Sequence, residues 1–207
     1  MSEADGDSSP SRRELWDERH AARDPIESHE PDPTLVTEVA DLRPGLALDL
    51  ATGDGRNAIW LAGHGWRVTA VDFSSVALDR ARRAAAAAGV EVDWLQADLL
   101  EWRLPEAAFD LVTLVFLHLP EGERRAVYAR AAAAVRPGGT LLVVGHDRTN
   151  LTDGVGGPHD PEVLFTPAEI ASELSGFTVV RAAVTRRSPD DARSPLDAVV
   201  RAVRDPA

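Results

Sequence analysis

Short apolar runs alternate with amphipathic stretches through the middle of the chain. Five of these runs predict strands, at residues 46–50, 66–72, 90–95, 109–116 and 140–144, and the stretches between them predict helices. Residues 66–72 show little alternation of apolar and polar positions, as expected of a strand covered on both faces. Strands that alternate with helices predict a parallel sheet with helices on both faces and right-handed crossovers.

The predicted helices end or begin at residues with the appropriate backbone preferences. Gly63 and Gly89 follow two of them, and Pro137 with two glycines breaks the helix predicted at residues 121–135. After a long connection at residues 145–165, which we expect to overhang the site, Thr166 begins a further helix that ends near Gly176. Residues 177–185 then predict a sixth strand.

The N-terminal part divides into three segments. Residues 1–10 are small, acidic and polar, which predicts a disordered tail. Residues 11–23 predict a helix with Ser11 and Glu14 as its capping box, and the prolines of residues 24–33 predict a linker. We therefore expect a lid helix and linker at residues 11–33 and one domain at residues 34–207, beginning with a helix at residues 34–42.

The composition is consistent with one folded domain. Of the 207 residues, 44% are apolar, which is ample for a core at this length. There is no cysteine, so disulfides, thiolate metal sites and cysteine nucleophiles are excluded. No apolar run approaches the roughly 20 residues of a membrane helix, and no signal-like block opens the chain, so we expect a cytoplasmic protein with no membrane partner.

The formal net charge is −12, and all 22 basic residues are arginine. An acidic chain is a poor ligand for a phosphate backbone, so the charge favours a small-molecule substrate and disfavours nucleic acid. The sequence gives no information on the oligomeric state.

A glycine-containing loop follows the first predicted strand, in the sequence Asp-Leu-Ala-Thr-Gly-Asp-Gly at residues 49–55. Glycines at 53 and 55 permit a tight turn and close approach of a ligand, and the helix that follows offers free N–H groups. The spacing of Gly53, Gly55 and Ala58 also satisfies the dinucleotide fingerprint. However, the carboxylate of Asp49 would repel a diphosphate and can receive a cationic amino group. This favours S-adenosyl-L-methionine over NAD as the cofactor.

Acidic residues follow the next two predicted strands as well. Asp72 ends the second strand, about where an acid can accept hydrogen bonds from both ribose hydroxyls, and Asp98 follows the third. Because the carboxyl ends of parallel strands meet at one edge of the sheet, we expect the three acids to converge there.

With these acids, the Phe109-Asp110 pair before an apolar run, and the Arg-Pro-Gly-Gly turn at 136–139, the chain resembles class I S-adenosylmethionine-dependent methyltransferases. The resemblance implies a Rossmann-like α/β fold with a seven-stranded, mostly parallel sheet, helices on both faces and an antiparallel last strand at residues 196–203. A C-terminal helix is the alternative there. Ala51 stands where that family usually has a glycine. The motif looks most like the small-molecule subgroup of tellurite-resistance-type and thiol methyltransferases.

The resemblance also implies which residues bind the cofactor, with Asp98 reading the adenine amino group and Trp16 on a helix that closes over the site or merely packs on the domain. The expected cofactor-binding residues are Asp49, Ala51, Gly53, Gly55, Arg56, Asn57, Asp72, Phe73, Asp98, Leu99, Val115 and Trp16.

Methyl transfer from a sulfonium needs alignment of the reacting atoms and exclusion of water, and a base helps only for acceptors that are not already ionised, such as phenols or amines. The candidate bases are His146, His118 and Asp147, in that order, because they follow the ends of strands four and five. His20, His29 and His64 are expected at the surface, and the histidines show no metal-ligand spacing, so no metal is expected. A catalytically silent binding module and an NAD-dependent oxidoreductase are the alternative functions.

Overall fold

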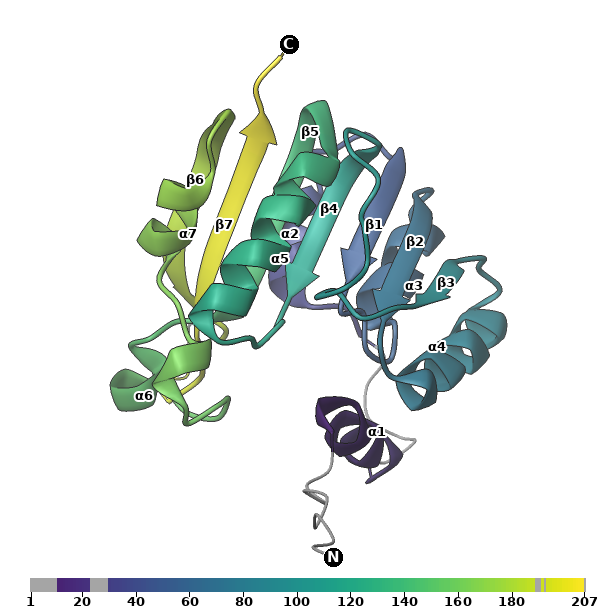
Figure 1. Ribbon diagram of the computed structural model, residues 1–207, viewed down its shortest axis with the longest axis horizontal. Helices are drawn as coiled ribbons and strands as arrows, with labels where there is room; N and C mark the ends of the chain where they lie inside the picture. The colour runs from purple at the N-terminus through teal and green to yellow at the C-terminus, as the bar shows by residue number, and fades with distance from the viewer. Residues whose placement is uncertain (1–10, 23–29, 189–190, 192, 207) are drawn as a thin grey trace, which may run out of the picture.

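Seven strands form one sheet in the order β3-β2-β1-β4-β5-β7-β6. The computed structural model describes residues 11–22, 30–188, 191 and 193–206. β1 to β5 pair in parallel, and β7 runs antiparallel to both of its neighbours (Figure 1). The strands are β1 (Leu46–Leu50), β2 (Arg67–Asp72), β3 (Asp93–Gln96), β4 (Phe109–Val115), β5 (Val135–His146), β6 (Phe177–Arg186) and β7 (Leu196–Arg204). This confirms the predicted Rossmann-like α/β fold, and the alternative of a C-terminal helix is wrong.

Helices cover both faces of this sheet (Figure 1). They are α1 (Arg12–Ala22), α2 (Pro33–Val39), α3 (Arg56–Gly63), α4 (Ser75–Ala88), α5 (Glu121–Ala134), α6 (Asn150–Asp153), α7 (Pro167–Glu173) and a 3-10 helix, η1 (Pro161–Val163). Within the part of the chain that is described, no helix is long and apolar enough to cross a membrane.

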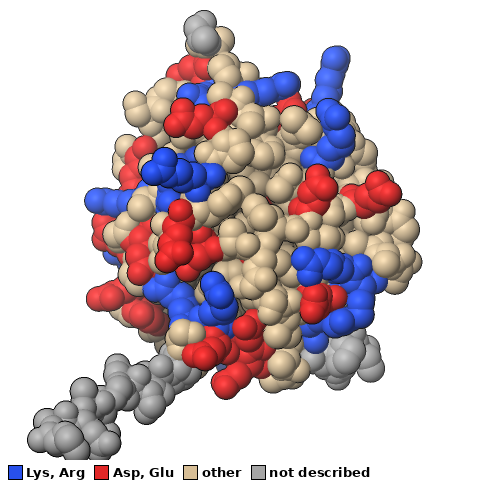
Figure 2. Space-filling model, turned by 45° about the vertical axis from the view of Figure 1, so that its right-hand side comes forward, with Lys and Arg blue, Asp and Glu red and all other residues tan. Residues whose placement is uncertain are grey.

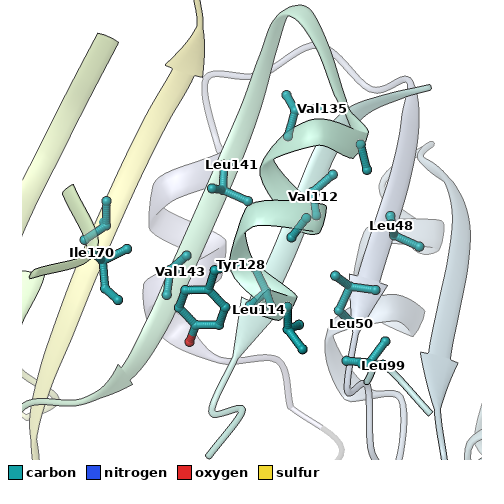
Figure 3. Close-up of a cluster of buried hydrophobic side chains, with 14 of the residues drawn as sticks. Leu48, Leu50, Leu99, Val112, Leu114, Tyr128, Val135, Leu141, Val143 and Ile170 are labelled. Atoms are coloured by element: carbon teal, nitrogen blue, oxygen red, sulfur yellow. The ribbon is translucent and has the colours of Figure 1, made fainter. Parts of the chain in front are cut away.

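The sheet separates two apolar cores because successive side chains of a strand point to opposite faces. Leu48 and Leu50 of β1 pack on the side of α5, where Tyr128 and Ile170 complete the layer (Figure 3). Ala47 packs on the other side, against apolar residues of α2 and α3. Asp49 shares the Ala47 face by the same alternation. Burial on both faces explains why the strands were recognisable as nearly continuous apolar runs.

The order of the strands reverses between β1 and β4, since β2 and β3 lie on one side of this pair and β5, β7 and β6 on the other. In open α/β sheets, such a switch point leaves a crevice at the carboxyl ends of the strands, where ligands bind. α1 lies across this end of the sheet (Figure 1).

Several helix and strand boundaries in the structure differ from the predicted ones. The linker is shorter than expected, because Pro33 already begins α2 and Asp32 caps it by accepting from the N–H groups of Thr34 and Leu35. The tail predicted at residues 1–10 and residues 24–29 of the predicted linker lie outside the described residues. β5 begins at Val135, which pairs with Phe109 of β4, but the regular pairing of the two strands continues only from Thr140. The turn predicted at residues 136–139 is therefore present as an irregularity inside β5.

The connection after β5 also differs from the expectation. β5 continues to His146, and α6 and η1 occupy part of the segment that the sequence left irregular. Thr166 and Glu169 form the predicted capping box at the start of α7.

Candidate active site

A cavity of about 440 Å³ lies at the switch point, within the size range of small-molecule sites. Its walls come from the loops after β1, β2, β3 and β4, from the end of β5 and from α1. The lining residues are Arg12, Trp16, His20, Asp49, Ala51, Thr52, Gly53, Asp54, Arg56, Asn57, Asp72, Phe73, Ala97, Asp98, Leu99, Leu100, Val115, Phe116, Leu117, His118, Leu119, His146 and Arg187.

Asp49 is the most deeply buried acid of the cavity wall, with 1% of its surface exposed. Its two carboxylate oxygens accept hydrogen bonds from the hydroxyls of Thr113, at 2.7 Å, and Thr52, at 2.6 Å. Burial raises the pKa of Asp49 from 3.8 to about 6, although these hydrogen bonds act in the opposite direction. Among the described residues, no arginine or histidine lies within 4.0 Å of this carboxylate. A cationic ligand group would therefore find negative charge that is not held in a direct ion pair, although Arg56 acts on it at longer range.

The loop after β1 reverses direction through left-handed backbone. Ala51 and Gly53 have φ of 57° and 56°, a region that costs an L-residue energy and suits glycine. Both line the cavity. The methyl of Ala51 is thus placed where a glycine would be the unstrained choice, and strain of this kind is concentrated at ligand sites.

Gly55 has a different role from the one predicted. It is the residue before α3, with φ of 78°, and it does not line the cavity. A Cβ at this position would lie 2.5 Å from the ring of Trp94 and 2.8 Å from the methyl of Ala81. Gly55 therefore allows α3 to pack closely on β3 and α4, and the expectation that it admits a ligand to the backbone is wrong.

Asp72 and Asp98 both line the cavity, as predicted. Asp72 is 5% exposed and accepts from the backbone N–H groups of Gly53, at 2.8 Å, and Ser74, at 2.9 Å, so it joins the β1 loop to the β2 loop. Burial raises its pKa, and the two hydrogen bonds counteract the rise. Each carboxylate oxygen keeps a second lone pair that can accept from a ligand hydroxyl. Asp98 accepts from Leu100 N at 2.9 Å.

α1 contributes Arg12, Trp16 and His20 to the cavity wall. His20 is only 4% exposed, with Nδ1 at 3.0 Å from the carboxylate of Asp54, so its expected surface position is wrong. At the other end of the helix, Arg12 pairs with Glu123 of α5 at 2.8 Å. α1 therefore spans the cavity from one side to the other. Asp17 also accepts a hydrogen bond from the hydroxyl of Ser74.

The other two expected surface histidines have separate outcomes. His64 is exposed, with Nδ1 at 2.7 Å from the carbonyl of Trp60, which confirms its surface position. His29 lies outside the described residues.

The ends of β4 and β5 bring two of the three candidate bases together. The rings of His118 and His146 lie parallel within 11°, with centroids 5.5 Å apart, and the ring of Phe116 is 5.1 Å from that of His146. Phe116 has φ of 60°, which is exceptional for a bulky residue. This backbone conformation marks the point where β4 leaves the sheet beside the cavity.

Asp147, the third candidate base, does not line the cavity. One of its carboxylate oxygens accepts from the backbone N–H and the hydroxyl of Thr149, at 2.9 and 2.6 Å, immediately before α6. Its side chain therefore organises the connection after β5, and the structure does not place it as a base.

Of the twelve predicted cofactor residues, all except Gly55 line the cavity. The sequence analysis missed several others because they come from segments without a recognised motif. These are Arg12, His20, Thr52, Asp54, Ala97, Leu100, Phe116, Leu117, Leu119 and Arg187. Only Thr52 and Asp54 could have been found by their position inside the glycine loop.

The charges and hydrogen-bond acceptors of the residues that line the cavity match the polar groups of S-adenosylmethionine. Asp49 offers an ammonium group a buried carboxylate without a direct ion-pair partner, and Asp72 offers acceptors to ribose hydroxyls. A diphosphate would meet the carboxylates of Asp49, Asp54 and Asp72 on the same wall. Leu99 and Val115 supply apolar surface.

Comparison with known proteins agrees with this chemistry. Residues 47–139 match a family described as a methyltransferase domain. An uncharacterized methyltransferase of Mycobacterium tuberculosis is 38% identical over 122 residues, which cover 58% of this chain and 60% of that protein. The demethylmenaquinone methyltransferase of Thermus thermophilus is 38% identical over 103 residues, which cover 49% of this chain and 47% of that enzyme. The chain thus spans less than two thirds of the length of these relatives.

A solved structure shows the same fold over nearly the whole chain. It was reported for the conversion of a disulfide bond into a thioacetal group during echinomycin biosynthesis, and it has a TM-score of 0.72 at 24% identity, covering 93% of this chain and 92% of that one. The sheet order and the cavity at its switch point define a Rossmann-like α/β protein with a cavity of small-molecule size. Residues 47–139 thus resemble a methyltransferase domain, and the solved structure of an S-adenosylmethionine-dependent methyltransferase from Mesorhizobium loti shares the fold, with a TM-score of 0.67 at 20% identity, covering 83% of this chain and 96% of that one.

Proposed function

We propose that the protein transfers a methyl group from S-adenosylmethionine to a small-molecule acceptor. The observation that carries this proposal is the convergence of Asp49, Asp72 and Asp98, from the ends of three successive strands, on one cavity. In this proposal the first holds an ammonium group, the second ribose hydroxyls and the third the adenine amino group. When bound, S-adenosylmethionine supplies an electrophilic methyl group on a positively charged sulfur.

The remainder of the cavity wall suits an acceptor of modest size. Phe116, Leu117 and Leu119 add apolar surface to the cavity wall that carries the two stacked histidines, and α1 contributes another part of the wall. Alignment of the acceptor and exclusion of water are what a displacement at a methyl group requires. Trp16 and Arg12 of α1 contribute to this exclusion.

The surface charge supports a small acceptor over nucleic acid. Acidic and basic side chains are interspersed over the face in Figure 2, without a broad basic area, and the net charge is −12. A phosphate backbone is normally bound by clustered positive charge.

An acceptor screen tests the proposal. Purified protein is incubated with S-adenosylmethionine and a panel of thiols, phenols and chalcogen oxyanions, and the release of S-adenosylhomocysteine is measured. We expect turnover of at least one class, and loss of that turnover in Asp72→Ala. Turnover of thiols or tellurium oxyanions would support the subgroup suggested by the sequence. Cofactor binding without turnover across the panel would instead indicate a catalytically silent binding module.

A further inference from the structure

His146 and Arg187 line the cavity outside the loops after β1 to β3, and the buried carboxylate of Asp197 contacts both of them from behind the cavity wall. Arg187 follows β6, Asp197 lies in β7 and His146 ends β5. β7 runs antiparallel to β5 with Asp197 directly opposite His146, so the sheet itself fixes this juxtaposition. β6 and β7 form the hairpin that brings Arg187 to the same end.

The carboxylate of Asp197 is the centre of these contacts. It is 1% exposed and accepts two hydrogen bonds from Arg187, from Nε at 2.9 Å and from Nη2 at 2.8 Å. Nδ1 of His146 lies 3.3 Å from Oδ1, the oxygen that also accepts from Nη2 of Arg187; this is an ion-pair contact whose geometry falls short of a regular hydrogen bond, and Nδ1 has no hydrogen-bond partner among the described residues. Burial alone would raise the pKa of Asp197, but the contact with His146 and the hydrogen bonds from Arg187 lower it below its ordinary value. The carboxylate therefore stays ionised and favours a proton on Nδ1.

This arrangement leaves the other ring nitrogen, Nε2, as the acceptor of His146. In a neutral imidazole one nitrogen carries the proton and the other accepts, and the partner of the first determines which is which. His146 lines the cavity and is 7% exposed. A Cβ on Gly157 would lie within 3 Å of its ring, so the connection after β5 presses on the imidazole and limits its rotation.

The groups around His146 favour an aromatic acceptor. The Phe116 ring lies 5.1 Å from that of His146, and the guanidinium of Arg187 lies over Phe116, 4.7 Å from the ring centroid. Flat side chains and a cation over a ring provide stacking surface for another ring.

We propose that Asp197 and Arg187 are positioning residues that hold His146 as the general base for a phenolic hydroxyl acceptor. This inference rests on the proposed function and deepens it. Nε2 of His146 takes the hydroxyl proton, and a lone pair of the oxygen forms the new bond to the methyl carbon. The electron pair of the broken carbon–sulfur bond stays on sulfur, which becomes neutral. The imidazolium then releases the proton to solvent.

A phenol needs such a base because its pKa is near 10, whereas thiols and oxyanions supply more of the ionised nucleophile unaided. The geometry thus selects a phenol over the thiol and tellurium acceptors suggested by the subgroup resemblance.

Two readouts on Asp197→Asn test the proposal. Nitrogen NMR of the imidazole, in protein without ligand, should show the Nδ1–H tautomer of His146 in the wild type and a shift toward Nε2–H in the variant. Steady-state kinetics should show kcat for a phenol lowered about 10- to 1000-fold, with KM for S-adenosylmethionine nearly unchanged. Arg187→Gln, which keeps the carboxylate, should lower kcat less. Melting curves verify that each variant is folded.

Glu38→Gln supplies the matched control, because Glu38 is another buried acid paired with an arginine, Arg181, and does not line the cavity. Its kcat and the tautomer of His146 should match the wild type.

Three results would overturn the inference: an Nε2–H tautomer in the wild type, unchanged kcat in folded Asp197→Asn, or a wild type that methylates thiols but no phenol. Binding of S-adenosylhomocysteine to the same samples reports on the proposed function separately. Protein that keeps the Nδ1–H tautomer but binds no S-adenosylhomocysteine contradicts the proposed function and leaves the His146 arrangement supported.

Discussion

Replacing Asp49 with asparagine should stabilise the unliganded protein while weakening cofactor binding. The native state holds this carboxylate at 1% exposure, and burial raises its pKa from 3.8 to about 6. Since one pKa unit corresponds to 1.36 kcal/mol, ionising Asp49 costs the fold on the order of 3 kcal/mol at neutral pH. Asparagine has no charge to desolvate, and it can still exchange hydrogen bonds with the hydroxyls of Thr52 and Thr113.

The sign of the effect sets its pH dependence. The pKa of Asp49 is about 6 in the folded state and 3.8 in the ordinary case. Folding is therefore not penalised by Asp49 below about pH 4, where the carboxyl is protonated in both states, and the penalty grows as the pH rises through about 6. The Asp49→Asn variant should therefore match the wild type near pH 4. Above about pH 7 it should be more stable by about 1 to 3 kcal/mol.

Urea unfolding at several pH values measures this difference, and Asp79→Asn is the control. Asp79 lies on the exposed side of α4, paired with Arg82, so its replacement should change the free energy of unfolding by less than about 0.5 kcal/mol.

Calorimetry with S-adenosylhomocysteine should show at least tenfold weaker binding to Asp49→Asn, because a charge-assisted hydrogen bond is lost. Wild-type affinity should itself fall about tenfold between about pH 7 and pH 5 as Asp49 gains its proton. An Asp49→Asn variant that is less stable at neutral pH, or that binds as tightly as the wild type, would refute the reasoning.

Two further substitutions test the packing of the site. Gly55→Ala places a side chain on left-handed backbone, with its Cβ 2.5 Å from the ring of Trp94, so it should lower the free energy of unfolding by about 2 to 4 kcal/mol. Gly89→Ala is the control, because Gly89 also has a left-handed backbone, with φ of 67°, but open space around it. This variant should lower the free energy of unfolding by about 1 to 2 kcal/mol. Equal losses in urea unfolding would contradict the close packing at Gly55. His20→Ala should weaken S-adenosylhomocysteine binding several-fold by releasing α1 from Asp54, and unchanged affinity by calorimetry would show that α1 does not help to hold the cofactor.

The elements that could be predicted are those with a local signal. β1, β2 and β4 are mostly apolar because both faces of the sheet are covered, and this pattern is visible in a short window of sequence. The sequence alone predicts that Asp49 and Asp72 lie close together, because the carboxyl ends of parallel strands meet at one edge of the sheet. The antiparallel β7 came from family resemblance, since its apolar residues fit a helix as well.

The features that could not be predicted depend on partners that are distant in sequence. Gly55 packs against Trp94 of β3, and the sequence around Gly55 does not indicate this contact. His20 is buried by Asp54, 34 positions away, and so resembled a surface histidine of an acidic segment. Asp197 reaches His146 only through the return of β7 beside β5.

The most direct test of the central claim is a calorimetric titration of the protein with S-adenosylhomocysteine and, separately, with NADH. The claim is that buried negative charge at the switch point selects a ligand with an ammonium group and rejects a diphosphate. We predict saturable binding of S-adenosylhomocysteine at one site and no measurable heat of binding with NADH. Tight binding of NADH, with none of S-adenosylhomocysteine, would contradict it.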